Sequence, residues 1–397
     1  MIPLLLTSFT ASSCIGIGVD ATRESLLAQR SGLERCHFET VEIDTHIGEV
    51  RGVDAVQLPT ELARFDCRNN RLAELALRQD GLVEAAQRCA ARWGRKRIGV
   101  FMGTSTAGIL QTELAYRKRD PVTGALPPSF EYGATHNSFS VADYLRQRLQ
   151  LEGPAMAVSC ACASSAKVFA SARRMIEAGL IDAALVGGVD SLCLTTLYGF
   201  HSLQLSSPSP CRPFDIARDG ISIGEAAAFA LLERPGDDLD SDAVLLLGAG
   251  ESSDAYHMSA PHPEGHGARR AMQAALAAAG LEAGAIDYIN LHGTGTPSND
   301  RSESQAVTSV FGPTTPSSST KGATGHALGA AGALEAVISA IALQNGLMPG
   351  GVHTTRIDPT LTAFYIRENR RAPISHVLSN SFGFGGTNCS LVLGRAS

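Results

Sequence analysis

The sequence predicts an α/β protein built from layers of buried sheet and helix. Short apolar runs typical of strands recur between Ala-rich stretches typical of helices, and this alternation continues along the whole chain. The chain has 397 residues, of which 44% are hydrophobic, so it can bury a large core. Its length fits either two ordinary domains or one large duplicated domain.

The expected strands are continuous apolar runs rather than alternating ones, which indicates sheets that are covered on both faces. These runs are residues 2–6, 97–102, 155–158, 183–186, 226–232, 244–247, 286–291 and 390–393. The first run lacks a basic leader and is too short for a secretory or membrane-spanning segment, so it is expected to be a buried strand.

A polar, acidic and turn-forming stretch at residues 235–242 would be hard to bury. We expect it to join two halves of the protein, residues 1–234 and residues 243–397.

The bulk composition excludes several classes of partner. A net charge of −6 and a pI near 6.0 give no electrostatic argument for nucleic acid or a membrane surface as the main partner. Small molecules or proteins remain. The nine cysteines are scattered and odd in number, so free thiols in a reducing cytoplasm are expected.

Cys162 is expected at a turn between a strand and a helix. The apolar run 155–158 stops at residues 159–162, and residues 163–177 predict a helix. The free amides and the positive end of the helix dipole would lower the thiol pKa from about 8.5 and make the sulfur a nucleophile that accepts an acyl group. The alternative is a small buried apolar cysteine, which is our interpretation of Cys160. A zinc site at this pair lacks further ligands.

His292 follows the strand expected at residues 286–291 and lies beside small residues, where it can approach a ligand closely. Thr294 and Thr296 offer hydroxyls suited to an amide-bearing chain. Taken alone, His292 could equally be a hydrogen-bonded core histidine, and Glu303 a capping-box partner of Asp300.

His326 lies near the N-terminus of a helix expected at residues 327–345. The helix dipole there disfavours imidazolium, so we expect a neutral ring that donates a hydrogen bond to an oxyanion. Lys321 is either a surface lysine or a partner that holds Glu303 and the histidines in place.

A glycine-rich segment at residues 379–388 precedes the last expected strand. A phosphate loop would need a helix after it, so phosphate and dinucleotide binding are excluded. Gly383 and Gly385 would leave the amide of Phe384 exposed and its ring free to move, which suits an oxyanion donor on a mobile gate.

Together these segments resemble the β-ketoacyl-acyl-carrier-protein synthases of the I/II type. The matching segments are residues 161–164 (ACAS), 292–297 (HGTGTP), 321–326 (KGATGH) with 329–332 (GAAG), 380–388 (NSFGFGGTN), and a central signature at 212–215 (RPFD), 218–220 (RDG) and 224–225 (GE). The similarity runs from about residue 98 to residue 393, and separated motifs in the family's order make it specific.

The resemblance implies a thiolase-like, duplicated, five-layered α/β/α/β/α fold and a dimer, either a homodimer or a heterodimer with a related subunit. It also implies an acyltransferase that performs a decarboxylative Claisen condensation in fatty-acid, polyene or polyketide chain elongation. Cys162 would take the acyl group from an acyl carrier protein, and malonyl carrier protein would then lose CO2. His292 and His326 would stabilise the enolate, and the amides of Cys162 and Phe384 would hold the thioester oxygen.

The resemblance also assigns supporting residues. Lys321 and Glu303 would organise the site, Thr294 and Thr296 would hold the phosphopantetheine arm, and Thr106 and Phe382 would contact substrate. No tightly bound cofactor is expected. Related enzymes can hold a structural monovalent cation at positions that match Asn290, Glu335, Ser379 and Asn380.

Some positions depart from the family pattern. Cys160 replaces the usual Thr, and residues 7–9 replace a common Thr-Gly pair. Thr106 stands where an apolar gating residue often lies. These departures favour a specialised substrate, such as an unsaturated or polyene-like chain.

Two basic clusters are candidates for docking an acidic carrier protein. Arg64, Arg68 and Arg71 have the spacing of one helical face, and residues 117–119 form a second cluster. The alternative for each cluster is an ordinary solvent-exposed helix face that binds no partner.

Two rival functions remain. A thiolase acting on coenzyme A thioesters would need a second catalytic cysteine in the C-terminal half, where only Cys389 is available. A non-catalytic chain-length partner of a synthase would typically lack the nucleophile, whereas Cys162 is present.

Overall fold

The computed structural model describes residues 2–236 and 239–396. Its central feature is a mixed sheet in which, among these residues, 11 strands are hydrogen-bonded. In order across the sheet, the strands are β12 (Ser317–Ser318), β11 (Tyr288–Asn290), β15 (His376–Gly383), β16 (Thr387–Arg395), β10 (Val244–Ser253), β1 (Leu4–Ser13), β9 (Ala226–Glu233), β7 (Ala183–Asp190), β5 (Ile98–Gly103) and β6 (Ala155–Val158), with β2 (Gly16–Ile17) paired to β1.

The sheet consists of two halves with the same strand pattern. In one half β6, β5 and β7 are parallel, and β9 and β1 follow antiparallel. In the other half β12, β11 and β15 are parallel, and β16 and β10 follow antiparallel. The halves meet where β1 pairs with β10, at Leu4 opposite Leu246 and Leu5 opposite Leu245. The duplicated architecture implied by the sequence is therefore present.

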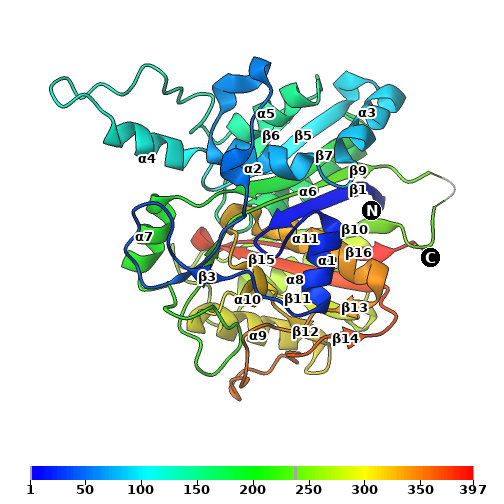
Figure 1. The fold of residues 1–397 in the computed structure, drawn as a ribbon. Coiled ribbons are helices and arrows are strands. Elements are labelled where there is room, and N and C mark those ends of the chain that lie inside the picture. Colours follow the sequence, from blue (N-terminus) through cyan, green and yellow to red (C-terminus); the bar gives the residue numbers. More distant parts are fainter. Residues whose placement is uncertain (1, 237–238, 397) are drawn as a thin grey trace.

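Helices occupy three further layers (Figure 1). The helices α6 (Ser164–Glu177) and α11 (Ala331–Asn345) lie between the two half-sheets and pack against both. The helices α2 (Arg68–Leu77), α3 (Leu82–Trp93) and α5 (Ser140–Arg148) cover the outer face of the first half. The helices α8 (His266–Ala279) and α9 (Pro297–Phe311) cover the outer face of the second half. The result is the five-layered thiolase-like fold.

The helix α11 is apolar around its whole circumference because both of its sides face a sheet. Every residue from 331 to 343 is buried. The span Leu328–Asn345 is the one helical segment of the described residues that is long and apolar enough to cross a membrane, and 89% of it is buried inside the protein. We therefore assign it as a core helix.

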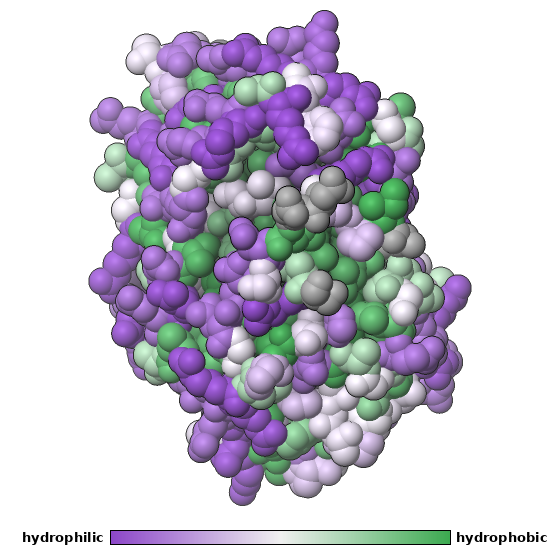
Figure 2. Space-filling model, turned by 90° about the vertical axis from the view of Figure 1, so that its right-hand side faces the viewer, coloured by the Kyte–Doolittle hydropathy of each residue, from purple (hydrophilic) through white to green (hydrophobic). Residues whose placement is uncertain are grey.

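The other α-helices and strands are short and lie outside the main layers. They are α1 (Val19–Leu27), α4 (Ile109–Arg117), α7 (Leu194–Ser202), α10 (Lys321–Thr324), the three-stranded sheet β3 (Glu34–Arg35), β4 (His46–Gly48) and β8 (Ile223–Gly224), and the pair β13 (Leu347–Met348) and β14 (Arg370–Arg371). Figure 1 shows α4 and the loop after it projecting from the body of the molecule. On the face that carries the termini, hydrophilic side chains cover the upper part and hydrophobic ones are scattered through the middle (Figure 2).

The expected strands are all present, and several extend beyond their apolar runs. The helix expected at residues 327–345 is interrupted, since a 3₁₀ turn at Leu328–Ala330 precedes α11. Of the expected join at residues 235–242, Asp237 and Asp238 lie outside the described residues, and the division into 1–234 and 243–397 stays a prediction.

The predicted arginine face is wrong. Arg64 belongs to a 3₁₀ segment, Thr60–Phe65, which ends before α2 begins at Arg68. The Arg68 side chain is only 5% exposed and forms ion pairs with Glu49, Asp54 and Glu225. A guanidinium that is buried among three carboxylates is not available to a docking protein, because pulling it away would leave buried charge uncompensated.

Candidate active site

Cys162 lies where the sequence predicts, between β6 and α6. The strand ends at Val158, and the helix begins two residues after the cysteine. Ala161 has a left-handed backbone with φ of 55°, which makes the sharp turn that presents the thiol. Gly383 of β15 lies against this turn, since a Cβ there would approach Cys162 N at 3.2 Å. The nucleophile turn is thus packed directly against the glycine-rich segment.

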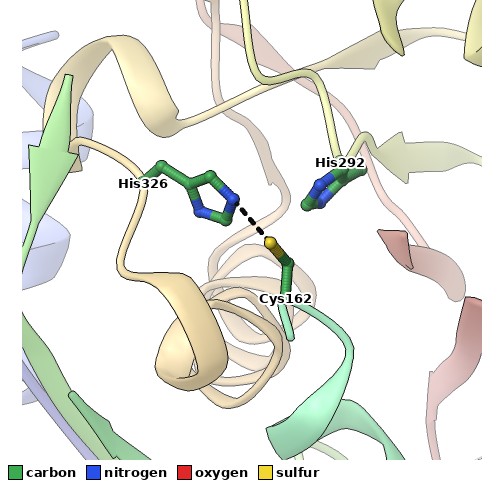
Figure 3. A group of neighbouring side chains, drawn as sticks. All are labelled: Cys162, His292 and His326. Carbon is green, nitrogen blue, oxygen red and sulfur yellow. Dashed lines mark hydrogen bonds between the residues drawn. The ribbon is translucent and has the colours of Figure 1, made fainter. Parts of the chain in front are cut away.

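Two imidazoles from the other half of the molecule meet this thiol (Figure 3). His326, in the loop between α10 and the 3₁₀ turn, places Nε2 at 3.1 Å from Cys162 Sγ. His292 follows β11, and its ring centroid lies 5.2 Å from that of His326 at an angle of 81°. Figure 3 shows both rings directed towards the sulfur from opposite sides. The structure therefore brings together the three residues that the sequence singled out.

The prediction of a lowered thiol pKa is wrong for this structure. Cys162 is only 6% exposed, and burial raises its pKa to about 12. The charge of Lys321 and a hydrogen bond from the Phe384 amide act in the opposite direction but do not outweigh burial. The resting group is consequently a neutral thiol, whose proton must leave as the sulfur reacts.

Both histidines are neutral, as predicted for His326, but the cause differs. Burial, followed by the charge of Lys321, lowers the pKa of each imidazole well below its ordinary value of 6.5. His326 Nδ1 has no hydrogen-bond partner among residues 2–236 and 239–396. Without a carboxylate to orient and charge the ring, His326 is a poor permanent base and a suitable neutral donor.

Lys321 is a buried residue of the site and not a surface lysine. Its Nζ donates to the carbonyl oxygen of His292 at 2.5 Å, lies 3.5 Å from His292 Nδ1, and is ion-paired with Glu335. An ammonium beside Nδ1 favours the tautomer in which Nε2 carries the proton. The sequence did not predict Glu335 as the ion-pair partner; Lys321 acts on the predicted Glu303 through its charge, which lowers the pKa of that carboxyl against the effect of burial.

Glu303 instead holds the backbone of the His292 turn. Its carboxylate accepts from His292 N at 2.8 Å and from Gly293 N at 2.7 Å. It also accepts from the side-chain amide of Asn380 at 3.2 Å. The helix cap is supplied by Thr296, which accepts from Asn299 N, so Glu303 is not a capping-box residue. Burial raises the pKa of this carboxyl to about 7.

Phe384 starts a 3₁₀ turn, Phe384–Gly386, directly after β15. Its amide donates to the Cys162 sulfur, and its ring lies 5.8 Å from the ring of Phe200. Gly385 and Gly386 follow with φ of 79° and 75°, a conformation that favours glycine. The amide is positioned to donate to an oxyanion formed at Cys162.

A small cavity of about 60 Å³ opens onto the thiol. The predicted site residues that line it are Cys162, His292, Thr294, Thr296, His326, Phe382 and Phe384. The hydroxyl oxygens of Thr294 and Thr296 form a hydrogen bond of 2.9 Å with each other. The ring of Phe382 lies 5.9 Å from that of His292, edge to face.

Thr106 does not line this cavity. Its hydroxyl donates to Asp190 Oδ1 at 2.9 Å, and the same carboxylate accepts from Thr104, from Ser105 N and, through Oδ2, from Gly329 N. Asp190 therefore ties the segment after β5 to the segment after His326. Sequence reasoning missed Asp190 because it looks like the polar end of an apolar strand.

Of the residues proposed to bind a monovalent cation, Asn290 and Glu335 have side-chain oxygens that are free to coordinate it. Asn290 Oδ1 and Glu335 Oε2 are buried without a hydrogen-bond partner in the described part of the chain, and Asn290 pairs with Ser379 across β11 and β15. The Asn380 side chain is already used, since it donates to Glu303 and accepts from Ser390. Asn290 and Glu335 would supply the side-chain ligands of such an ion.

Comparisons with known proteins agree with this geometry. Residues 3–237 match the family description "Beta-ketoacyl synthase, N-terminal domain", and residues 243–355 match "Beta-ketoacyl synthase, C-terminal domain". The 3-oxoacyl-[acyl-carrier-protein] synthase 2 of Staphylococcus aureus (strain MRSA252) is 31% identical over 412 residues, which cover 98% of each chain.

Two solved structures are similar over the whole chain. One is a ketosynthase (ApeO) in complex with its chain length factor (ApeC) from Xenorhabdus doucetiae, with a TM-score of 0.91, 37% identity, and coverage of 100% of this chain and 98% of that one. The other is the ishigamide ketosynthase/chain length factor, with a TM-score of 0.89, 28% identity and full coverage of both chains.

Proposed function

The chain belongs to the β-ketoacyl synthase family, whose members are acyltransferases of carrier-protein-dependent chain elongation in fatty-acid or polyketide synthesis, and we propose that it performs a decarboxylative Claisen condensation on Cys162. The observation that carries this proposal is the 3.1 Å approach of His326 Nε2 to a thiol that is otherwise buried in a small cavity. The neighbouring His292 supplies the second imidazole that decarboxylation requires.

In the first half-reaction, Cys162 Sγ attacks the thioester carbonyl of an acyl carrier protein. The new bond joins Sγ to the acyl carbon, and the bond to the carrier's phosphopantetheine sulfur breaks. The thiol proton moves to the leaving sulfur, while His326 Nε2–H donates a hydrogen bond to the charge that develops on Cys162 Sγ, which avoids a free thiolate in a site that disfavours it. The amides of Cys162 and Phe384 hold the oxyanion.

In the second half-reaction, a malonyl carrier protein occupies the emptied cavity and loses CO2. Neutral His292 and His326 donate from Nε2 to the enolate oxygen that develops, and Lys321 beside Nδ1 keeps His292 in that tautomer. The enolate carbon attacks the acyl thioester, a carbon–carbon bond forms, and the bond from the acyl carbon to Cys162 Sγ breaks. The leaving sulfur takes up one proton from solvent, which restores the neutral thiol. The product is a β-ketoacyl carrier protein, and no tightly bound cofactor takes part.

Thr294 and Thr296 are proposed to receive the phosphopantetheine arm. Both hydroxyls line the cavity and currently bond to each other. An incoming amide would replace that bond with one donor and one acceptor contact. Phe382 and the Phe384 gate would contact the acyl chain.

Intact-mass spectrometry after incubation with acyl carrier protein tests the nucleophile, and Cys160 offers a matched control two residues away. Wild type and Cys160→Ala are expected to gain the acyl mass, and Cys162→Ala is expected to gain none. Release of CO2 from malonyl carrier protein should depend on both His292 and His326. Equal acylation of the Cys162→Ala variant would disprove the proposal.

A thiolase reaction is disfavoured by the position of Cys389. This cysteine, the only one of the C-terminal half, is fully buried in β16, and burial raises its pKa strongly. A purely structural subunit is disfavoured by the intact thiol and imidazole cluster.

The assembly is proposed to be a heterodimer with a related, chain-length-determining subunit. Two similar structures pair a ketosynthase with a chain length factor. Within the described part of the chain, β6 is an edge strand with one unpaired side, and the projecting loop after α4 exposes apolar Val122. Native mass spectrometry should show the stable dimer only when both subunits are co-expressed, whereas a stable dimer of this chain alone would favour a homodimer.

We also propose a cytoplasmic location, which the nine free cysteines support.

A further inference from the structure

A second group of metal-ligand side chains lies outside the catalytic cluster, where the chain enters α8. His262, Glu264 and His266 each offer one ligand atom, and these atoms lie within 4.8 Å of one another. His266 Nε2 contacts Glu264 Oε2 at 2.8 Å, and His262 Nδ1 accepts from Glu264 N at 3.2 Å, which leaves Nε2 of His262 for a metal. The two imidazoles are stacked with centroids 4.0 Å apart, and one ring has to rotate for both lone pairs to meet at one ion. We propose that this triad binds a divalent transition metal such as Zn²⁺ and thereby restrains the loop that lines the mouth of the active-site cavity.

The donor set selects the class of metal. Imidazole nitrogens suit zinc, copper and nickel, whereas calcium and magnesium require oxygen ligands. Two histidines and a carboxylate supply three of the four ligands of a tetrahedral zinc ion, and water can take the fourth position because the triad is partly exposed.

The backbone of the triad is already fixed in a tight turn. Gly265 N donates to the carbonyl oxygen of His262 at 2.8 Å, and Ser302 Oγ donates to the same oxygen at 2.9 Å. Gly265 has φ of 64°, and a Cβ there would lie 2.5 Å from Ser302 O. Because the turn requires this glycine and is anchored on α9, the three side chains are already held close together, and a metal bound to them would keep the turn from opening.

The same loop reaches the catalytic cavity. Asp254, Ser259, Ala260 and Pro261 line it, and His262 follows directly. Asp254 Oδ2 accepts from His262 N at 3.1 Å, and Asp254 N donates to Gly386 O at 2.8 Å.

The loop is also bonded to the gate segment. Gly385 N donates to Met258 O at 2.7 Å, so both glycines after Phe384 contact the loop. A metal that ties His262 to His266 at the start of α8 would fix one end of this loop and slow the movement of the Phe384 gate. Metal binding itself does not depend on the proposed condensation reaction.

Zinc binding is measured by isothermal titration of the full chain. The variants are His262→Asn/His266→Asn, the matched control His257→Asn, which alters an exposed histidine of the same loop, and Cys162→Ala, which removes the other thiol and imidazole cluster able to hold a metal. Wild type, His257→Asn and Cys162→Ala are expected to keep the site, and the double variant is expected to bind one zinc fewer while melting normally without metal. An unchanged stoichiometry in the double variant would overturn the site.

The restraint is measured by the rate at which iodoacetamide alkylates Cys162, followed by peptide mapping. Zinc is expected to slow alkylation several-fold in wild type and in His257→Asn but not in the double variant. Equal protection of the double variant would show that zinc acts on Cys162, His292 and His326 directly, and no protection of zinc-loaded wild type would equally overturn the restraint. Neither readout needs an active condensing enzyme.

Discussion

The sequence predicted the position of the catalytic Cys162 but not the direction of its pKa shift. Its place at the start of a helix could be predicted because a strand-like run, a turn and a helix follow in order. The direction of its pKa shift could not, because the helix dipole can be inferred from sequence whereas the depth of burial depends on the opposite half of the protein. Burial and the dipole act against each other, and burial dominates.

A thiol with a pKa of about 12 predicts a specific pH profile for alkylation. The reactive thiolate fraction of Cys162 should grow about tenfold with each pH unit from pH 7 to pH 10, because deprotonation stays incomplete throughout. The rate constant for iodoacetamide, measured by intact mass with Cys162→Ala as the blank, tests this. A rate that levels off below pH 9 would contradict a raised pKa.

Glu303 predicts a pH-dependent contribution to stability. Its pKa is raised from 4.5 to about 7 in the fold. Between these values the folded protein holds a proton that the unfolded chain has released, so rising pH favours unfolding and lowers the free energy of unfolding.

Urea denaturation from pH 4.5 to pH 7.5 measures this effect. Wild type should lose more stability across that interval than Glu303→Gln, which cannot ionise at this position. Parallel profiles for the two proteins would show that Glu303 titrates at its ordinary pKa.

At the level of elements, short-range sequence patterns predicted the helices and strands well, but they did not predict where a helix is interrupted. The bounds of α6 and β6 were expected almost to the residue, because an apolar run and an amphipathic helix carry their own periodicity. The arginine face failed because Cys67, with an extended backbone, separates the 3₁₀ segment from α2. A spacing of i, i+4 and i+7 has meaning only if one helix spans it.

The contact between α6 and α11 helps to set the distance between the nucleophile and the imidazole of His326, and Gly332 lies within this contact. A Cβ at Gly332 would lie 2.7 Å from Ala166 N and 2.9 Å from Ser381 Oγ. Gly332→Ala should lower the free energy of unfolding by about 1–3 kcal/mol and reduce acylation of Cys162, because the helices must separate.

Gly284→Ala is the matched control for that change, since no described residue apart from its chain neighbours has an atom within 4 Å of a Cβ at that position. It should leave both urea stability and acylation close to wild type. Equal effects from the two substitutions would mean that the helix contact does not determine the site.

For the whole molecule, the duplication could not be recognised in the sequence by eye, although it organises the site. Cys162 lies between β6 and α6, and the segment from Lys321 to His326 lies between β12 and α11, which are equivalent places in the two halves. The two halves repeat the same strand pairing, but their side chains differ. A sequence comparison detects similarity of side chains only, so it does not reveal the repeat.

The halves are expected to depend on each other for folding. Separately expressed residues 1–234 and 243–397 should each lack a cooperative thermal transition, since α6 and α11 pack against both half-sheets. Co-expression of the two fragments should restore one transition and Cys162 acylation. A cooperative transition in either fragment alone would show that the central helices are not shared.

The all-round apolar surface of α11 has a consequence during synthesis. Its companions α6, β7 and β9 leave the ribosome earlier, but β15 and β16 are translated only after a further stretch of about 30 residues or more, so one flank of the nascent helix faces water until the last strands emerge. A released chain truncated between residues 345 and 376 would leave that apolar flank of α11 exposed, and chaperones should capture such a truncated chain more strongly than the full-length protein.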